Sequence, residues 1–317
     1  MEGLSMPYQP EPIPSAGYGY TAFGLKIHSD IALPMLEPLS CSDADLTIRL
    51  SDIPEQHEQA IPVKQHAWVK DDCVWLRFPG AGEYWIKGGG EIRALPPTEE
   101  NIQDWYFYLL GAAVMCALTQ RGCLPLHACA VEIDGSVVLL LGATGSGKST
   151  LALYLDQLGF RVLSDDMSAV YLHPDGGINI WPAYPYAKLD VADDSPFPND
   201  RLWSYTENRR NKNLFRLDRY RSHEPGEVGA AYILKQSDVT DIQRITPLQA
   251  TRVLVRNTHR DTLFRTMQGA QEHLKLCSEM IRRLPVFRFS RSFHNDTLAY
   301  STEYLLLHIR SELAKEQ

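Results

Sequence analysis

A glycine-rich segment has the residue types and the spacing of a phosphate-binding loop. It reads Gly-Ala-Thr-Gly-Ser-Gly-Lys-Ser-Thr and fits the pattern G-x-x-x-x-G-K-[ST] in full. Glycines let the backbone turn tightly, so that its N–H groups approach phosphate oxygens. The pattern predicts that Lys148 reaches the β- and γ-phosphates and that the Ser149 hydroxyl binds Mg²⁺. The predicted nucleotide-binding residues are Gly142, Ala143, Thr144, Gly145, Ser146, Gly147, Lys148, Ser149 and Thr150.

The residues on either side of this loop support that interpretation. Val137–Leu141 is a continuous apolar run, as expected for a strand that is buried on both faces. Ser149–Leu158 has an apolar stripe at helical spacing, and Gly159 is a typical helix stop. The loop would therefore lie at a helix N-terminus, whose dipole favours anions. A chance match in a Gly/Ser loop does not account for this context.

Two adjacent carboxylates are the next candidates for chemistry. Asp165 and Asp166 follow the strand predicted at Arg161–Ser164, only one helix and one strand after the loop. A right-handed crossover would make that strand a parallel neighbour of Val137–Leu141, about 4.8 Å away, and would bring both carboxylates to the γ-phosphate region. Because adjacent strand residues point to opposite faces, one Asp would face Mg²⁺ and the other would accept a proton from an attacking hydroxyl. A solvated turn or a helix cap is the structural alternative.

The elements that must position these residues fall into two parts. Residues 1–17 are rich in Pro and Gly and are expected to form a flexible tail. Residues 18–120 alternate apolar with polar side chains and end in a helical pattern over Asn101–Gln120, which predicts a β-rich domain. Residues 121–317 read as α/β and form the second predicted domain. Its later helices are expected at Thr246–Asn257, Gln271–Arg283 and Thr297–Ala314.

The composition limits the classes of function. A hydrophobic content of 44% fits a globular chain of 317 residues. The formal net charge of −8 argues against a general nucleic-acid binder, but not against a local basic pocket. The six cysteines form no CxxC pair, so we expect buried free thiols in a reducing compartment. Met1–Gly19 lacks an apolar signal segment and Trp105–Leu118 is too short to span a membrane, so the expected location is the cytoplasm.

His127, the glycine-rich loop and the segment RVLSDD resemble the core of the HPr kinase/phosphorylase superfamily. Members of that superfamily have a His at the corresponding strand start and a paired Asp soon after the loop. The spacing from Lys148 to Asp166 is similarly short, whereas typical P-loop ATPases and GTPases carry their acidic residue much further on. The resemblance implies an α/β fold with a P-loop kinase core of the HPr kinase / phosphoenolpyruvate carboxykinase type.

The resemblance is sharper to the HPr-kinase-like proteins encoded with lasso-peptide biosynthesis, and it covers nearly the whole chain. The segments that carry it are YTAFGLKIHSDIALPML, LPLHACAVEIDG and WPAYPYAKL. It implies an ATP- and Mg²⁺-dependent kinase that phosphorylates a serine hydroxyl at the C-terminus of a precursor peptide. Two alternatives stay open: another acceptor, such as free serine or a small carrier protein, and a nucleotide-gated binding or regulatory module without kinase turnover.

The resemblance also implies roles for single residues. Lys148 would neutralise phosphate charge, and Asp166 would be the general base, assisted by His127. Asp165 would lie on the metal side, although the roles of the two Asp residues could be exchanged. Asp190 lies roughly where HPr kinases carry a metal-binding Glu, and an ordinary surface Asp is the other interpretation.

A C-terminal serine also brings a carboxylate, which a cation should hold. The candidate substrate-binding residues are Lys188, Arg209, Arg210 and Lys212, and an ordinary solvated face is the alternative for each of them. The N-terminal β-rich domain carries no catalytic signal. It is expected either to bind the peptide by strand addition or to form a homo-oligomer, and the sequence does not separate these two roles.

Overall fold

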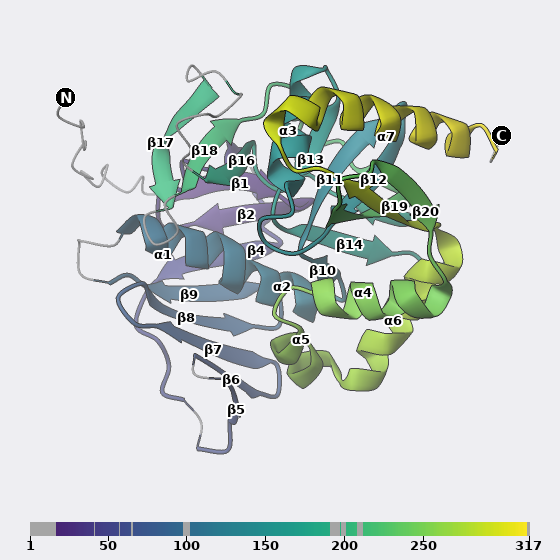
Figure 1. Ribbon diagram of the computed structural model, residues 1–317. Coiled ribbons are helices and arrows are strands. Elements are labelled where there is room, and N and C mark those ends of the chain that lie inside the picture. The colour runs from purple at the N-terminus through teal and green to yellow at the C-terminus, as the bar shows by residue number, and fades with distance from the viewer. Residues whose placement is uncertain are drawn as a thin grey trace.

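The computed structural model describes residues 17–40, 42–56, 58–64, 66–97, 102–190, 197, 201–207 and 212–315. Within this part of the chain the fold is mixed α/β with three sheets (Figure 1). The first sheet has the strand order β3-β1-β2-β4-β9-β8-β7-β6-β5. Its strands are β1 (Tyr18–Ala22), β2 (Leu25–Ser29), β3 (Glu37–Pro38), β4 (Leu46–Leu50), β5 (Ile61–Val63), β6 (Ala67–Lys70), β7 (Cys73–Phe78), β8 (Gly82–Lys87) and β9 (Glu91–Leu95).

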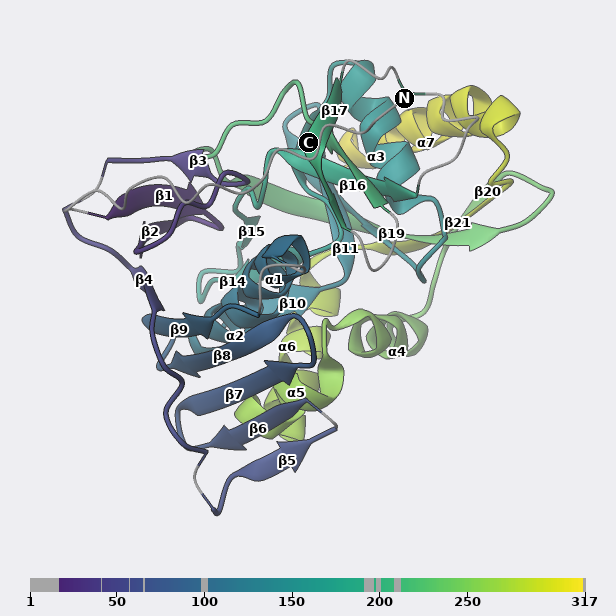
Figure 2. The ribbon, with the colours of Figure 1, turned by 90° about the vertical axis from the view of Figure 1, so that its left-hand side faces the viewer.

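One face of the first sheet packs against a helical segment. The segment consists of α1 (Ile102–Tyr108), a π-helical turn (Leu109–Ala113) and α2 (Val114–Gln120), which confirms the predicted helix. Figure 2 shows α1 and α2 between the first sheet and the strands of the second sheet. The core at this place also contains Met167 and Tyr184, so side chains from both predicted domains pack together.

The second sheet carries the glycine-rich loop. Its strand order is β10-β14-β15-β19-β12-β11-β13, with β21 paired to β19 and β20 paired to β21. The strands predicted before the loop and after its helix are confirmed as β12 and β13. The strands are β10 (Leu124–Leu126), β11 (Ala128–Ile133), β12 (Ser136–Leu141), β13 (Arg161–Ser164), β14 (Ser168–Leu172), β15 (Ile178–Ile180), β19 (Gly226–Gln236), β20 (Asp241–Arg244) and β21 (Val286–Arg291).

A tight hairpin sets the order of the central strands. Asp134 and Gly135 join β11 to β12 and have φ of 50° and 87°. A two-residue turn with φ above zero at both positions matches the twist of antiparallel strands. Strand β11 therefore lies against one side of β12, and the parallel strand β19 lies against the other.

Helices cover both faces of the second sheet (Figure 1). On one face α3 and α7 pack over Val138 and Leu140, and on the other α4, α5 and α6 pack over Val137, Leu139 and Leu141. This explains the unbroken apolar run of β12. The later predicted helices are confirmed within a few residues, and α5 is additional. The helices are α3 (Lys148–Gln157), α4 (Pro247–Asn257), α5 (Asp261–Gln268), α6 (Ala270–Arg283) and α7 (Leu298–Leu313).

The third sheet is small and has the strand order β16-β18-β17. Its strands are β16 (Tyr186–Asp190), β17 (Leu202–Glu207) and β18 (Lys212–Arg216). In the described part of the chain the five cysteines are unpaired and all but Cys73 are buried, as predicted, while Cys41 lies outside it. Among the described residues, none of the helices has the length and apolar character needed to cross a membrane.

Candidate functional site

Three strand ends converge at one edge of the second sheet. Strand β11 runs antiparallel to both β12 and β13, with Ala128 opposite Leu141 and Ala130 opposite Ser164. The start of β11 therefore lies beside the ends of β12 and β13, which are parallel to each other as predicted. The expectation that these two strands are neighbours was wrong, because the hairpin partner β11 lies between them. This interposed strand places His127 between the glycine-rich loop and the acidic pair.

The loop turns directly into helix α3. Gly147 has a φ of 74° and is the N-terminal capping residue of α3, and no side chain caps the helix. Its first N–H groups are therefore open to an external acceptor. The Lys148 side chain is buried, and its ammonium donates to the carbonyl oxygens of Gly142 and Ala143 at 2.8 and 3.1 Å. The predicted loop residues thus form one compact turn with a lysine folded onto it.

The loop has room and unused polar groups for a phosphate ligand. Gly145 has a φ of 81°, and a Cβ built there would meet no atom within 4 Å. The Ser146 hydroxyl is buried and has no hydrogen-bond partner among the described residues. Ser149 lies in the first turn of α3 and is half-buried, so a cation bound at the loop can reach its hydroxyl. These features fit a polyphosphate with a bound Mg²⁺.

Asp165 is buried at this edge of the second sheet. Its side chain is 5% exposed, and its two oxygens accept hydrogen bonds from Cys129 Sγ and from the backbone N–H of Lys188, each at 2.7 Å. Burial and the Asp165 carboxylate raise the pKa of the Cys129 thiol well above its usual value, so the thiol keeps its proton and donates. Each carboxylate oxygen has a second lone pair left for a ligand.

Asp166 contacts other groups than Asp165 does, although both carboxylates lie beside Lys188, and the alternation of strand residues does not account for this difference. Strand β13 ends at Ser164, and Asp166 has a φ of 68°, in the left-handed region. Such a conformation is costly for a residue other than Gly and is often found at functional sites. His127 Nδ1 lies 2.7 Å from the backbone oxygen and 3.1 Å from the Oδ1 of Asp166. The left-handed turn therefore presents the carboxylate to the histidine at the start of β11.

Cations determine the ionisation of Asp166. Burial alone would raise the pKa of its carboxyl. The hydrogen bond from His127 and the charge of Lys188 outweigh burial, with a further contribution from Lys212, and hold this pKa well below its usual range. Lys188 Nζ lies 3.9 Å from Asp166 Oδ2 and 4.6 Å from the centre of the Phe107 ring. Two of the predicted substrate-binding residues are thus near the acidic pair.

Three other residues were predicted from the sequence, namely Asp190, Arg209 and Arg210. Arg209 and Arg210 lie outside the described residues. The backbone of Asp190 ends β16 opposite Lys212, two residues beyond Lys188. No group of three or more His, Cys, Asp or Glu side chains that could hold a metal ion occurs among the described residues. Mg²⁺ is commonly held by one or two carboxylates together with phosphate oxygens, so the expected donors are Ser149 and Asp165.

A further segment, which was not predicted from the sequence, lies beside His127. The backbone N–H of His127 donates to Asn257 O at the end of α4, which brings His259 and Arg260 to the site. Burial and the charge of Arg260 lower the pKa of His259 to about 3, and Asp166, His127 and Lys188 also act on it. Arg260 has a φ of 51°, a second left-handed residue at this place. A lone Thr-His-Arg after a helix has no spacing that signals such a position.

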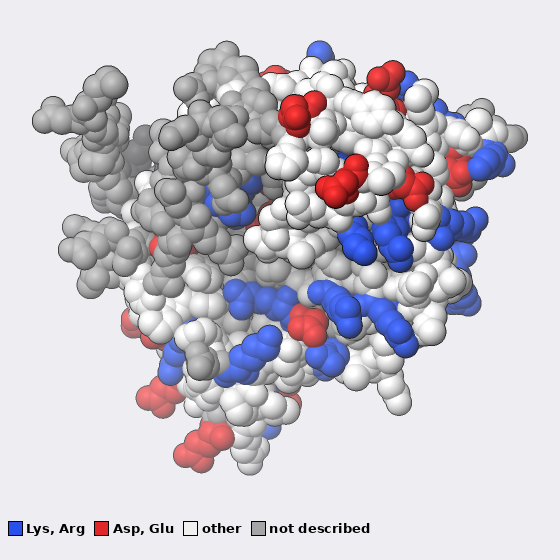
Figure 3. All heavy atoms as spheres, in the orientation of Figure 1, with Lys and Arg blue, Asp and Glu red and all other residues white. Residues whose placement is uncertain are grey.

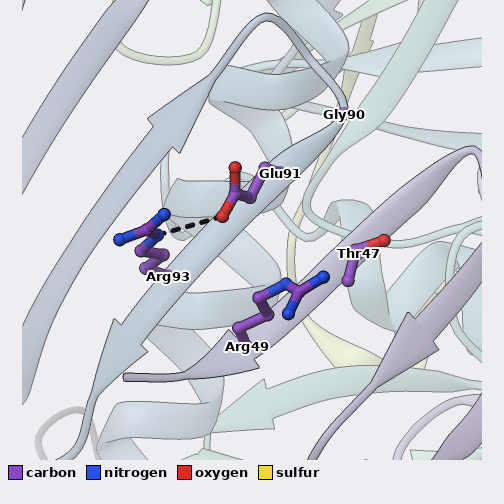
Figure 4. Close-up of a pocket in the computed structure, with 5 residues that line it drawn as sticks. All are labelled: Thr47, Arg49, Gly90, Glu91 and Arg93. Atoms are coloured by element: carbon purple, nitrogen blue, oxygen red, sulfur yellow. Dashed lines mark hydrogen bonds and ion pairs between the residues drawn. The ribbon is translucent and has the colours of Figure 1, made fainter. Parts of the chain in front are cut away.

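The surface around this segment is basic. Figure 3 shows Lys and Arg side chains gathered over α4 and above it, and Lys235, Arg252 and Arg256 are exposed. This local excess occurs in a chain whose formal net charge is −8. A depression elsewhere on the molecule, on the outer face of the first sheet, is lined by Thr47, Arg49, Gly90, Glu91 and Arg93 (Figure 4). None of the predicted site residues lines that depression.

The match to known proteins is limited to structure. No family model matches the chain, and no curated protein matches it. Among the solved structures that match is one described as the structure of the Hpr(Ser) kinase/phosphatase from Coxiella burnetii, with 14% sequence identity and a TM-score of 0.32. The match covers 59% of this chain and 98% of that chain. A likeness at this TM-score identifies neither a fold family nor an activity.

Proposed function

We propose that this chain is an ATP- and Mg²⁺-dependent kinase that phosphorylates the C-terminal serine of a lasso-peptide precursor. The observation that carries the proposal is the meeting of two kinds of group at one sheet edge. An uncapped helix N-terminus with a glycine-rich loop and Lys148 lies on one side, and the ionised Asp166 with His127 lies on the other. Phosphoryl transfer requires such a pairing of phosphate binding and hydroxyl orientation.

The phosphate side would work mainly through its backbone. The N–H groups of the loop and of the first turn of α3 would hold the β- and γ-phosphates, and Lys148 would exchange its carbonyl partners for phosphate oxygens. Ser149 and Asp165 would hold the metal. A bound Mg²⁺ supplies positive charge that neutralises the phosphate oxygens as charge develops on them.

The acceptor side would orient the attacking hydroxyl. Asp166 is ionised at every working pH, because its pKa is lowered, and it is a hydrogen-bond acceptor for the serine O–H. A low pKa also makes it a weak base. In a loose transition state the hydroxyl proton leaves late, so orientation of the oxygen contributes more than early proton removal. His127 fixes the Asp166 carboxylate through its Nδ1 contact.

The neighbouring lysine suits an acceptor that carries its own carboxylate. In a C-terminal serine only Cβ and Cα separate the hydroxyl oxygen from the carboxylate carbon. A hydroxyl bound to Asp166 would therefore bring the carboxylate close to Lys188, whose Nζ lies 3.9 Å from Asp166 Oδ2. Charge-assisted contacts of this kind are stronger than neutral hydrogen bonds. Free serine has the same two groups and is the second candidate acceptor.

Mass spectrometry of acceptors would test the proposal. The protein is incubated with ATP, Mg²⁺ and a precursor peptide that ends in serine, and the peptide is expected to gain the mass of one phosphate on its last residue. A peptide that ends in alanine is the control. Phosphorylation of free serine alone would move the assignment to a small-molecule kinase. Absence of ATP binding by the wild-type protein would end the proposal.

A further inference from the structure

A buried arginine lies behind the glycine-rich loop. Arg291 is the last residue of β21, which runs parallel to β19 as β12 does, so it lies at the sheet edge that carries the loop. Along β21 the residues Phe287 and Phe289 pack on the face that α3 and α7 cover. Arg291 continues this row and contacts Gly147, the N-terminal capping residue of α3. The sequence alone gives no motif that marks it.

The guanidinium of Arg291 contacts the loop directly. Its Nη2 donates to Gly147 O at 3.3 Å, and its Nη1 donates to Ser292 O at 3.0 Å. A Cβ built on Gly147 would lie 2.6 Å from Nη2, so only glycine allows this approach. The side chain is 2% exposed, and its Nε has no hydrogen-bond partner among the described residues. The arginine is thus enclosed with part of its donor capacity unused.

The charge of Arg291 is not balanced by the described part of the chain. Within those residues burial is the one influence on its pKa and no carboxylate acts on it, while the Phe293 ring lies 5.1 Å from its Cζ; a buried charge is costly unless it is paired with an opposite charge. Burial lowers its pKa to about 10, so it is still charged at neutral pH. The nearest helix end is the N-terminus of α3, which is itself positive, and Lys148 is the next residue after Gly147. Positive charge therefore accumulates at a place where an anion would relieve it.

We propose that Arg291 is a second cation of the phosphate site, which holds the loop at Gly147 and supplies the charge that a bound polyphosphate neutralises. This inference rests on the proposed function, because it names a further residue of the same nucleotide site. It predicts a separation of two properties. Removal of the charge weakens polyphosphate binding, while the protein without ligand loses an unbalanced buried charge and is not destabilised.

Two substitutions of Arg291 test this separation. In Arg291→Met, affinity for ATP and for inorganic tripolyphosphate, measured by titration calorimetry, is expected to fall by about tenfold or more. The melting temperature without ligand is expected to stay the same or rise. Arg291→Lys keeps a charge but not the planar fork, and it should recover most of the affinity for tripolyphosphate.

Arg201 provides a matched control for a buried arginine with a structural role. It is 9% exposed, pairs with Asp156 of α3 and donates to Arg216 O at 2.7 Å. Because its charge is paired, Arg201→Met should lower the melting temperature and leave the tripolyphosphate affinity of the folded protein unchanged.

Three results would overturn the inference. They are unchanged tripolyphosphate affinity in Arg291→Met, a melting temperature lowered as far as in Arg201→Met, and failure of both Arg291→Met and Arg291→Gln to fold. Each would assign Arg291 to the structure alone. If the wild-type protein binds neither ATP nor tripolyphosphate, the proposed function itself fails. If the wild-type protein and Arg201→Met bind and Arg291→Met binds equally well, only this inference fails.

Discussion

The two sides of the candidate site are built in different ways. The proposed phosphate side comes from one continuous segment, Gly142–Thr150, in which backbone N–H groups and a helix end would be the binding groups. The acceptor side comes from separate segments that supply His127, Asp166, Lys188 and His259. The conformation of a continuous segment depends mainly on the residues within that segment. The acceptor side exists only when β11, β13, β16 and the end of α4 have packed together, so it depends on the whole fold.

The charges on the two sides also differ. On the phosphate side Lys148 and Arg291 lie at the positive end of α3, and Asp165 is engaged by Cys129 and a backbone N–H. On the acceptor side the carboxylate of Asp166 is surrounded by cationic groups. An anionic ligand would therefore neutralise the phosphate side, whereas the Asp166 carboxylate on the acceptor side already has cationic neighbours from the chain itself. Substitutions should therefore separate ATP binding from turnover.

The largest effect is expected for Asp166→Asn. A neutral amide holds the serine hydroxyl by a weaker hydrogen bond than the carboxylate does and cannot take the proton when it leaves late in the transfer, so kcat should fall by about 10²–10⁴-fold while the Kd for ATP changes by less than about threefold. Steady-state kinetics and titration calorimetry measure the two quantities. Asp175→Asn, in an exposed turn, is the matched control and should retain full activity. An equal loss of ATP affinity and turnover in Asp166→Asn would show that the two sides are not separable.

The difference between the two sides also explains how much the sequence could reveal. The loop, its flanking strand and helix, and the acidic pair are near one another in the chain and follow a known spacing, so they were predictable. The Asp134-Gly135 turn is a recognisable hairpin signal that would have placed β11 beside β12. His259 and Arg291 reach the site through the end of α4 and the pairing of β21 with β19, which no local spacing reveals.

Local conformation accounts for another part of the difference. The two Asp side chains were expected to diverge because strand residues alternate, yet the strand ends before them. Asp166 instead adopts a left-handed conformation that only the surrounding structure can enforce, and both carboxylates lie beside Lys188. Strands β14 to β20 were not predicted in detail. All but β19 have six residues or fewer, and β19, with 11 residues, pairs with β12 and β21, which are distant in sequence.

The next effect concerns the phosphate side. Lys148→Met removes the cation of the loop, and kcat/KM for ATP should fall by about 10²–10³-fold because transition-state charge is no longer stabilised. The KM for the peptide should stay near the wild-type value, since Lys148 lies on the other side of the site. Thermal melting must show a folded variant, because Lys148 also bonds two loop carbonyls. A raised peptide KM with unchanged ATP kinetics would reverse the assignment of the two sides.

A smaller effect is expected for Lys188→Met. Loss of one charge-assisted contact should raise the KM for a peptide with a free C-terminal carboxylate by about tenfold. The same peptide with an amidated C-terminus has no carboxylate to lose and should show little difference between wild type and variant. Initial-rate measurements with both peptides test this pair of outcomes. An equal rise of KM for both peptides would remove the carboxylate contact from Lys188.

The smallest effect is on the pH dependence of the free energy of unfolding, and it comes from His259. Its folded-state pKa of about 3 lies below the value near 6.5 of an unfolded histidine. Below about pH 6.5 the unfolded chain binds a proton that the folded chain does not, so stability falls as pH falls toward 3, by up to about 1.4 kcal/mol per pH unit. Asp166 stays ionised over this window, because its pKa is lowered. Above pH 6.5 the His259 contribution is constant.

Replacement of His259 by glutamine should remove this pH dependence. Between pH 6 and pH 5 the free energy of unfolding of the wild-type protein should fall by about 1 kcal/mol more than that of His259→Gln, as measured by urea denaturation. His223→Gln, at an exposed position, should keep the wild-type slope. Equal slopes for wild type and His259→Gln would mean that His259 is protonated in the folded protein.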